Sequence, residues 1–121
     1  MAVKNFKELI VWQKAMDVAE LVYGLVKKLP RKEVYSLCNQ LTRSAVSIPS
    51  NIAEGQARRS SKEFVQYLSV ARGSAAELET QLLLSVRIGY LASSDVIETQ
   101  NLLNEVVRIL NALIVKLSTD H

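Results

Sequence analysis

Apolar residues recur at spacings of three and four along most of the chain, which is the pattern of amphipathic helices that bury one face. Four helices are predicted, over residues 6–28, 32–55, 60–89 and 94–117. Their connections are short, so sequential helices are expected to lie antiparallel. The sequence therefore predicts an all-α fold, an antiparallel up-down-up-down four-helix bundle in which residues 1–121 form a single domain.

The first and last predicted helices carry more apolar surface than one buried face requires. In the first helix, the stripe expected to enter the core comprises Leu9, Trp12, Met16, Ala19, Tyr23 and Val26. Additional apolar surface beside that stripe comes from Val11, Val18, Leu21, Val22 and Leu25, and the last helix has a similar second stripe. A four-helix bundle of this size offers burial on one side of each helix. The second stripes therefore predict that the protein associates with itself.

The second predicted helix is interrupted by a proline within the run Gln40 to Gly55, QLTRSAVSIPSNIAEG. Pro49 has no N–H and its ring crowds the carbonyl four residues earlier, so an undistorted helix costs about 3 kcal/mol. We expect either a kink at Pro49 or a restart in which Ser47 caps the N–H of Ser50, because a first turn needs no N–H from proline. Gly55 is expected to end the helix.

The third predicted helix has a thin section of small residues, namely Ala71, Gly73, Ser74, Ala75 and Ala76. Glycine in a helix interior costs about 1 kcal/mol relative to alanine, so Gly73 is expected to mark a close contact with the kinked part of the second helix. This packing interpretation gives structural roles to Ser47, Pro49, Ser50, Asn51, Glu54, Gly55 and Gly73. An alternative is a ligand or nucleic-acid site formed by Arg43, Asn51, Glu54, Arg58 and Arg59. Both interpretations stay open.

Three separated blocks of sequence carry a resemblance to a known family. They are LIVWQKAM at residues 9–16, RSAVSIPSNIAEG at 43–55 and YLSVARGSAAELETQL at 67–82. With these blocks the chain resembles the small bacterial four-helix-bundle proteins encoded in intervening sequences of 23S ribosomal RNA genes. That family is similar to the accessory variability determinant of diversity-generating retroelements, a basic pentameric bundle that binds nucleic acid and a reverse transcriptase. The resemblance implies a homo-oligomer, a pentameric ring, with nucleic acid and a protein as partners, and it implies no reaction.

The positive charge is concentrated in the first half of the chain. Residues 1–62 hold 11 Lys and Arg against 5 Asp and Glu, whereas residues 63–121 hold 4 against 7. Such asymmetry steers an anionic partner toward one part of the surface. The candidate phosphate-binding residues are Lys27, Lys28, Arg31, Lys32, Arg43, Arg58 and Arg59. They lie near helix ends, so we expect two basic rims whose binding is strongly salt-dependent and weak in sequence preference.

The residue types needed for catalysis or metal binding are scarce. His121 is the single histidine and stands at the end of the sequence, and the single cysteine, Cys38, lies in an apolar helical context. Neither a Cys/His metal spacing nor a glycine-rich phosphate loop occurs, so no catalytic residue, metal or cofactor is expected. The sequence has no apolar run long enough to cross a membrane and no signal peptide, which favours a cytoplasmic protein.

These observations favour a non-enzymatic, oligomeric binding module that contacts RNA or DNA through its basic rims. The alternative is a protein–protein scaffolding oligomer without affinity for nucleic acid, in which the acidic second half matters as much as the basic first half. Aromatic residues are few and stand at core spacings, so stacking on bases is not expected to contribute.

Overall fold

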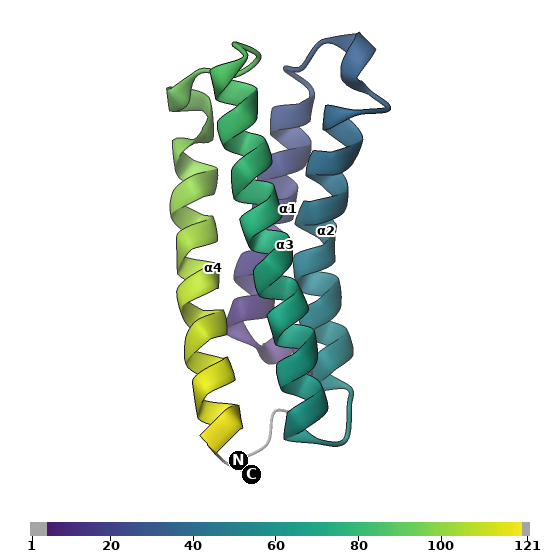
Figure 1. Ribbon diagram of the computed structural model, residues 1–121, viewed down its shortest axis with the longest axis vertical. Helices are drawn as coiled ribbons and strands as arrows, with labels where there is room; N and C mark the ends of the chain where they lie inside the picture. Colours follow the sequence, from purple (N-terminus) through teal and green to yellow (C-terminus); the bar gives the residue numbers. More distant parts are fainter. Residues whose placement is uncertain (1–4, 120–121) are drawn as a thin grey trace.

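The computed structural model describes residues 5–119 and shows four long helices. These are α1 (Ile10–Val26), α2 (Leu37–Gln56), α3 (Ser61–Arg87) and α4 (Ser93–Thr119), with short 3₁₀ helices at η1 (Phe6–Glu8) and η2 (Arg31–Glu33). Successive helices run in opposite directions, and α4 returns beside α1, which closes the bundle (Figure 1). Residues 5–119 contain no strand. The all-α, antiparallel up-down-up-down fold is therefore confirmed.

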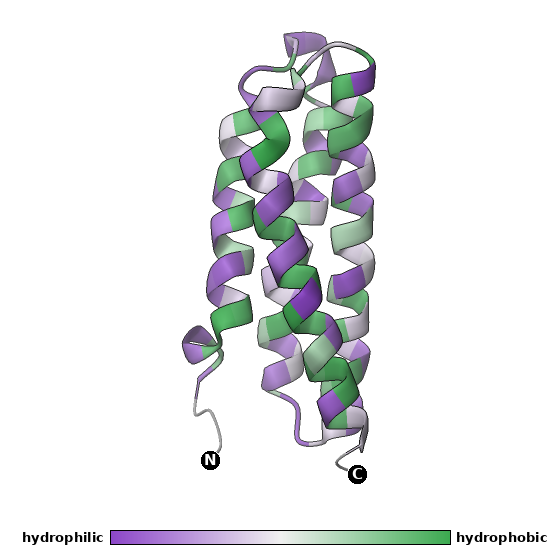
Figure 2. Cartoon of the chain, turned by 90° about the vertical axis from the view of Figure 1, so that its left-hand side faces the viewer, coloured by the Kyte–Doolittle hydropathy of each residue, from purple (hydrophilic) through white to green (hydrophobic). Residues whose placement is uncertain are grey.

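Each helix contributes one apolar face to a single core. Hydrophobic and hydrophilic residues alternate along the helices, as Figure 2 shows, and the side chains that are completely enclosed come from all four helices. They include Val18, Leu41, Ile48, Leu82, Leu103 and Leu110. Every buried side-chain nitrogen and oxygen of residues 5–119 has a hydrogen-bond partner. The core thus has no unsatisfied polar side chain to destabilise it.

The face that α1 buries differs from the predicted stripe. Val11, Val18 and Val22 are at most 1% exposed, whereas Met16 is 44% and Tyr23 52% exposed. Both sides of the helix are apolar, so spacing alone could not distinguish them. The inward side carries the smaller residues, which let α1 approach its neighbours closely, whereas Met16 and Tyr23 remain outside.

Pro49 neither breaks nor restarts the second helix, so the predicted restart at Ser47 is wrong. α2 continues through the proline to Gln56, and Pro49 is itself buried. Asn51 supports this section, because its Nδ2 donates to the Ser47 carbonyl at 2.8 Å and to Ser47 Oγ at 3.0 Å. Packing and these local hydrogen bonds offset the cost of the missing N–H.

Gly55, and not Gly73, marks the close contact between α2 and α3. A Cβ added at Gly55 would lie 2.6 Å from Tyr67 Cβ and 2.9 Å from Phe64 Cδ1. Gly55 lies inside α2 and therefore does not end the helix as predicted. Gly73 is exposed, and a Cβ added there would meet nothing within 4 Å. The expected role of Gly73 in packing is therefore wrong.

Side-chain hydrogen bonds cap the starts of α2, α3 and α4. Ser60 caps α3, since its Oγ accepts from the Glu63 N–H at 3.1 Å. The second helix begins later than predicted, because η2 precedes it and the carboxylate of Glu33 accepts from the Leu37 N–H at 3.4 Å. At the start of α4, Asp95 Oδ2 accepts from the backbone N–H of residue 92 at 2.8 Å.

Candidate nucleic-acid interface

The structure divides the predicted basic residues among three places. Lys27 and Lys28 follow α1 and, with Arg31 and Lys32 of η2, lie at the end of the bundle drawn uppermost in Figure 1. Arg58 and Arg59 lie in the connection between α2 and α3, at the opposite end. Arg43 belongs to neither end, because it projects from the body of α2. The seven residues therefore do not form one patch on a single chain.

At the η2 end, one basic residue is paired and three are not. Lys28 Nζ lies 2.8 Å from Asp95 Oδ1, an ion pair that links the end of α1 to the start of α4. The hydrogen bond from Lys28, with that from the backbone of residue 92, lowers the pKa of Asp95. Lys27, Arg31 and Lys32 are exposed and make no ion pair among residues 5–119. We call these three residues the η2 rim.

Acidic Glu33 sits within the η2 rim but is occupied by hydrogen bonds. Ser36 Oγ donates to Glu33 Oε1 at 2.6 Å, and the Tyr90 hydroxyl donates to Glu33 Oε2 at 2.8 Å. These two hydrogen bonds lower the pKa of Glu33, with a smaller contribution from the Leu37 N–H and the charge of Lys32. The same contact raises the pKa of Tyr90. Glu33 therefore joins η2 to the α3–α4 connection.

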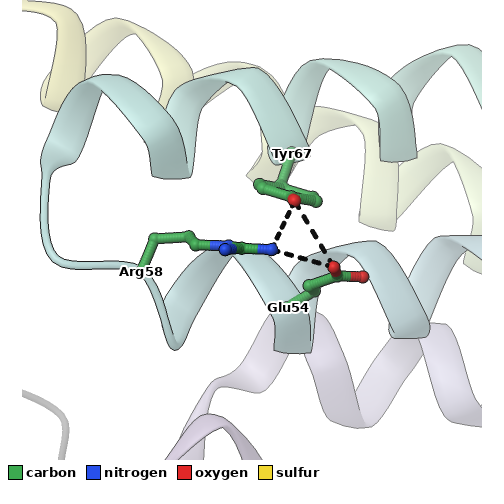
Figure 3. A network of polar contacts seen from close by, with 3 residues as sticks. All are labelled: Glu54, Arg58 and Tyr67. Carbon is green, nitrogen blue, oxygen red and sulfur yellow. Dashed lines mark hydrogen bonds and ion pairs between the residues drawn. The ribbon is translucent and has the colours of Figure 1, made fainter.

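At the opposite end, Arg58 is held against α3. Its Nη2 donates to Glu54 Oε2 at 3.0 Å and to the Tyr67 hydroxyl at 2.6 Å, as Figure 3 shows. The guanidinium also lies 4.8 Å from the centre of the Tyr67 ring, within range of a cation–π contact. Arg59 is exposed and makes no ion pair among residues 5–119. The i,i+4 spacing of Glu54 and Arg58 could have indicated this pair from sequence, but Tyr67 could not be identified as its partner.

Arg43 lines a polar groove between α2 and α3, with a volume of about 360 Å³. The residues of this groove are Gln40, Arg43, Ser44, Ser47, Glu77 and Gln81. The residues predicted to form one ligand site therefore do not lie together. Asn51 donates to Ser47 Oγ, whereas Glu54 and Arg58 pair with each other at the end of α2. Sequence reasoning missed Glu77 and Gln81, which reach the groove from a different helix.

Two apolar grooves lie on opposite sides of the bundle. The α1–α2 groove encloses about 490 Å³ and is lined by Trp12, Met16, Ala19, Glu20, Tyr23, Val46, Pro49, Ser50 and Ala53. The α3–α4 groove encloses about 670 Å³ and is lined by Thr80, Leu83, Leu84, Val86, Arg87, Ser93, Val96 and Gln100. Because the helices form a closed ring in the order α1 to α4, these two pairs face away from each other.

The described residues contain few groups suited to other chemistry. Burial, and to a smaller degree the charge of Glu33, raises the pKa of the Cys38 thiol, which keeps it protonated. Within residues 5–119, no cluster of three His, Cys, Asp or Glu could hold a metal ion. His121 lies outside the described residues. None of the helices described is both long and apolar enough to cross a membrane.

Comparison with known proteins places the chain among relatives whose names assign no activity. Residues 7–112 match the family model of the 23S rRNA-intervening sequence protein. A crystal structure of a protein of unknown function from the S23 ribosomal protein family of Bacteroides thetaiotaomicron shares 27% sequence identity and a TM-score of 0.80. The match covers 87% of this chain and 98% of that one. No curated protein matches. With the four-helix fold and a family match over most of its length, the chain belongs to the 23S rRNA-intervening sequence protein family.

Proposed function

We propose that this protein is a non-enzymatic, oligomeric binding module of the cytoplasm that contacts the phosphate backbone of RNA or DNA. The observation that carries the proposal is the η2 rim. Lys27, Arg31 and Lys32 are exposed at one end of the bundle, and no carboxylate among residues 5–119 pairs with them. Unpaired cations bind phosphates at the smallest cost, because no internal ion pair must be broken first.

Self-association is part of the proposal and has its own support in the two apolar grooves. Met16 and Tyr23 at the α1–α2 groove, and Leu83 and Leu84 at the α3–α4 groove, are each 44–52% exposed. Exposed apolar surface of this kind marks protein interfaces. The grooves differ in volume and in their lining residues and face away from each other, so one copy's α3–α4 groove is suited to pack on the α1–α2 groove of the next.

Such head-to-tail contacts close into a ring when the rotation between neighbours permits it. The charges lining the grooves are complementary, since Glu20 lies in one and Arg87 in the other. A ring repeats the η2 rim around its axis and multiplies the phosphate contacts available to one nucleic acid. The family resemblance favours a pentamer.

Complementary variants test the head-to-tail arrangement. Met16→Glu should disable the α1–α2 groove and Leu84→Glu the α3–α4 groove, and each variant alone should sediment as a monomer. Mixed in equal amounts, the two should form a dimer, because each variant keeps the surface that the other has lost. Failure of the mixture to associate, or a wild type that is monomeric at micromolar concentration, would contradict the arrangement.

Nucleic-acid binding is tested by fluorescence anisotropy at about 50 mM and about 200 mM salt, because affinity that depends on phosphate contacts falls steeply between these two concentrations. Replacing Lys27, Arg31 and Lys32 by alanine should weaken binding to every sequence and reduce the slope of log K against log salt by about two to three per chain. The matched control replaces Arg72, Arg108 and Lys116, which removes equal charge from α3 and α4. No binding by the wild type at about 50 mM salt would end this proposal.

A protein scaffold is the second candidate, and the apolar grooves are the observation that favours it. Their combined surface is suited to protein contacts whether or not the η2 rim binds phosphate. An oligomer that binds no RNA or DNA at low salt would support the scaffold over the nucleic-acid module.

A further inference from the structure

The polar groove between α2 and α3 is lined by side chains of both charges, which a phosphate-binding site does not require. Arg43 borders it from α2 and Glu77 from α3. Neither side chain makes an ion pair among residues 5–119, although their charges are opposite. The groove of about 360 Å³ that both side chains line is open to a ligand. A phosphate would be attracted by Arg43 but repelled by Glu77, so the groove is suited to a neutral group that offers both acceptors and donors.

The floor of this groove is held in place by hydrogen bonds between the two helices. Ser44 Oγ lies 2.7 Å from Gln81 Oε1, and Ser47 Oγ lies 2.8 Å from Ser74 Oγ. Ser44 and Gln81 are only 4% and 8% exposed. Side chains fixed in this way need little reordering when a ligand enters, which lowers the entropic cost of binding.

We propose that this groove binds the edge of a guanine base, with Glu77 accepting from guanine N1–H and N2–H and Arg43 donating to guanine O6 and N7. The proposal rests on the proposed nucleic-acid binding and adds a preference for one base to it. A carboxylate accepts only and a guanidinium donates only, so together they match a base edge with two adjacent donors followed by two acceptors.

Only guanine presents that order of groups. Adenine has a single donor group, N6, between two acceptors, and cytosine places the N3 acceptor beside its N4 donor. Either base would bring a lone pair against the Glu77 carboxylate. Uracil presents one donor between two carbonyl oxygens and would be disfavoured for the same reason.

The position of the groove fits a strand held at the η2 rim. Arg43 stands six residues after the first residue of α2, Leu37, which is about 9 Å along the helix axis. η2, with Arg31 and Lys32, ends at Glu33, three residues before the last residue that precedes α2. A single strand whose phosphates contact the rim can therefore turn one unstacked base into the groove, which is how proteins read single-stranded RNA.

The test uses uridine oligonucleotides that carry one guanosine, adenosine, cytidine or inosine, with anisotropy as the readout. The guanosine oligonucleotide should bind about five- to tenfold more tightly than the adenosine and cytidine ones, at the low end of the range for a bidentate base contact. Inosine lacks the N2 amino group and should fall between them. Glu77→Gln should abolish the preference while keeping salt-dependent affinity, and the control Glu79→Gln should change neither. Equal affinity for all four oligonucleotides would overturn the proposal.

Guanosine alone, followed by NMR of the Gln40 and Gln81 side-chain amides, separates this proposal from the one on which it rests. Shifts with guanosine but not adenosine, and their loss in Glu77→Gln, would support the groove even if the oligonucleotides fail to bind through phosphate. If the oligonucleotides bind but these amides do not respond to guanosine, phosphate binding at the η2 rim would stand and guanine binding in the groove would be refuted.

Discussion

The contact at Gly55 gives the sharpest test of how the bundle packs. A Cβ at this position would lie 2.6 Å from Tyr67 Cβ, 2.9 Å from Phe64 Cδ1 and 3.3 Å from the Phe64 carbonyl oxygen. The Phe64 ring could rotate away, but Tyr67 Cβ is fixed to the backbone of α3. Gly55→Ala therefore forces α2 and α3 apart, and overpacking of this kind costs about 1–3 kcal/mol.

Gly73→Ala is the matched control, because it changes the same atoms in an open position. Alanine is favoured over glycine within a helix interior by about 1 kcal/mol, a gain that applies in full at Gly73 and to a smaller extent at Gly55, the last residue but one of α2. Gly73→Ala should therefore be more stable than the wild type and Gly55→Ala less stable, with most of the difference between them coming from the packing cost of about 1–3 kcal/mol. For a chain of this length, each kcal/mol shifts Tm by about 4 °C.

The measurement is urea unfolding of both variants and the wild type, followed by helical circular dichroism at one protein concentration, because the proposed self-association would add to apparent stability. Equal stabilisation by Gly55→Ala and Gly73→Ala would show that α2 and α3 are not in close contact at Gly55. The account of this interface would then be wrong.

Three further predictions concern the η2 end of the bundle. The folded-state pKa of Glu33 lies below its ordinary value of 4.5, so the contribution of this carboxylate to stability is present above that pH and is lost as the pH falls. Glu33→Gln should therefore flatten the acid side of the curve of stability against pH measured by urea unfolding. An unchanged curve would contradict this prediction. The folded-state pKa of Tyr90 is raised above 10.0, so its contribution is lost as the pH rises beyond that value, and Tyr90→Phe should remove this alkaline dependence in the same assay. The raised pKa of Cys38 predicts slow reaction with Ellman's reagent at neutral pH in the folded protein and fast reaction in urea, whereas equal rates would show an accessible thiolate.

The sequence was sufficient to predict the four helices and their order, because period and helix caps are local properties. Ser60 illustrates this, since its cap is set by a residue three positions away. The inward face of α1 was not predictable, because Val18 and Met16 lie on two faces of comparable hydropathy. Only the fit against the other helices selects the smaller residues for the core.

The candidate site depends on contacts between helices and was predictable only in part. The basic residues around Arg31 could be predicted to lie at one end of the bundle, because they flank Pro30, which separates two helices. The pairing of Lys28 with Asp95 could not, because it joins residues far apart in the sequence. Likewise, Arg43 was recognised as a candidate while its groove partner Glu77 was not, because single-sequence periodicity does not fix how α2 is rotated relative to α3. Gly55 was misread for the same reason, since its requirement for a missing side chain comes from Tyr67 on another helix.

The orientation of α1 connects the packing of the bundle to its proposed assembly. Had α1 buried Met16 and Tyr23, the α1–α2 groove would have lost its apolar lining, and one of the two surfaces proposed for self-association would not exist. Burial of the smaller valines instead leaves the larger side chains beside Pro49, on the flank of the bundle. The η2 rim lies at the end of the bundle. The proposed assembly and the proposed phosphate contact would therefore use different residues. Substitutions at the flank should then change oligomer size without changing the charge of the rim, and substitutions at the rim should change affinity without changing oligomer size.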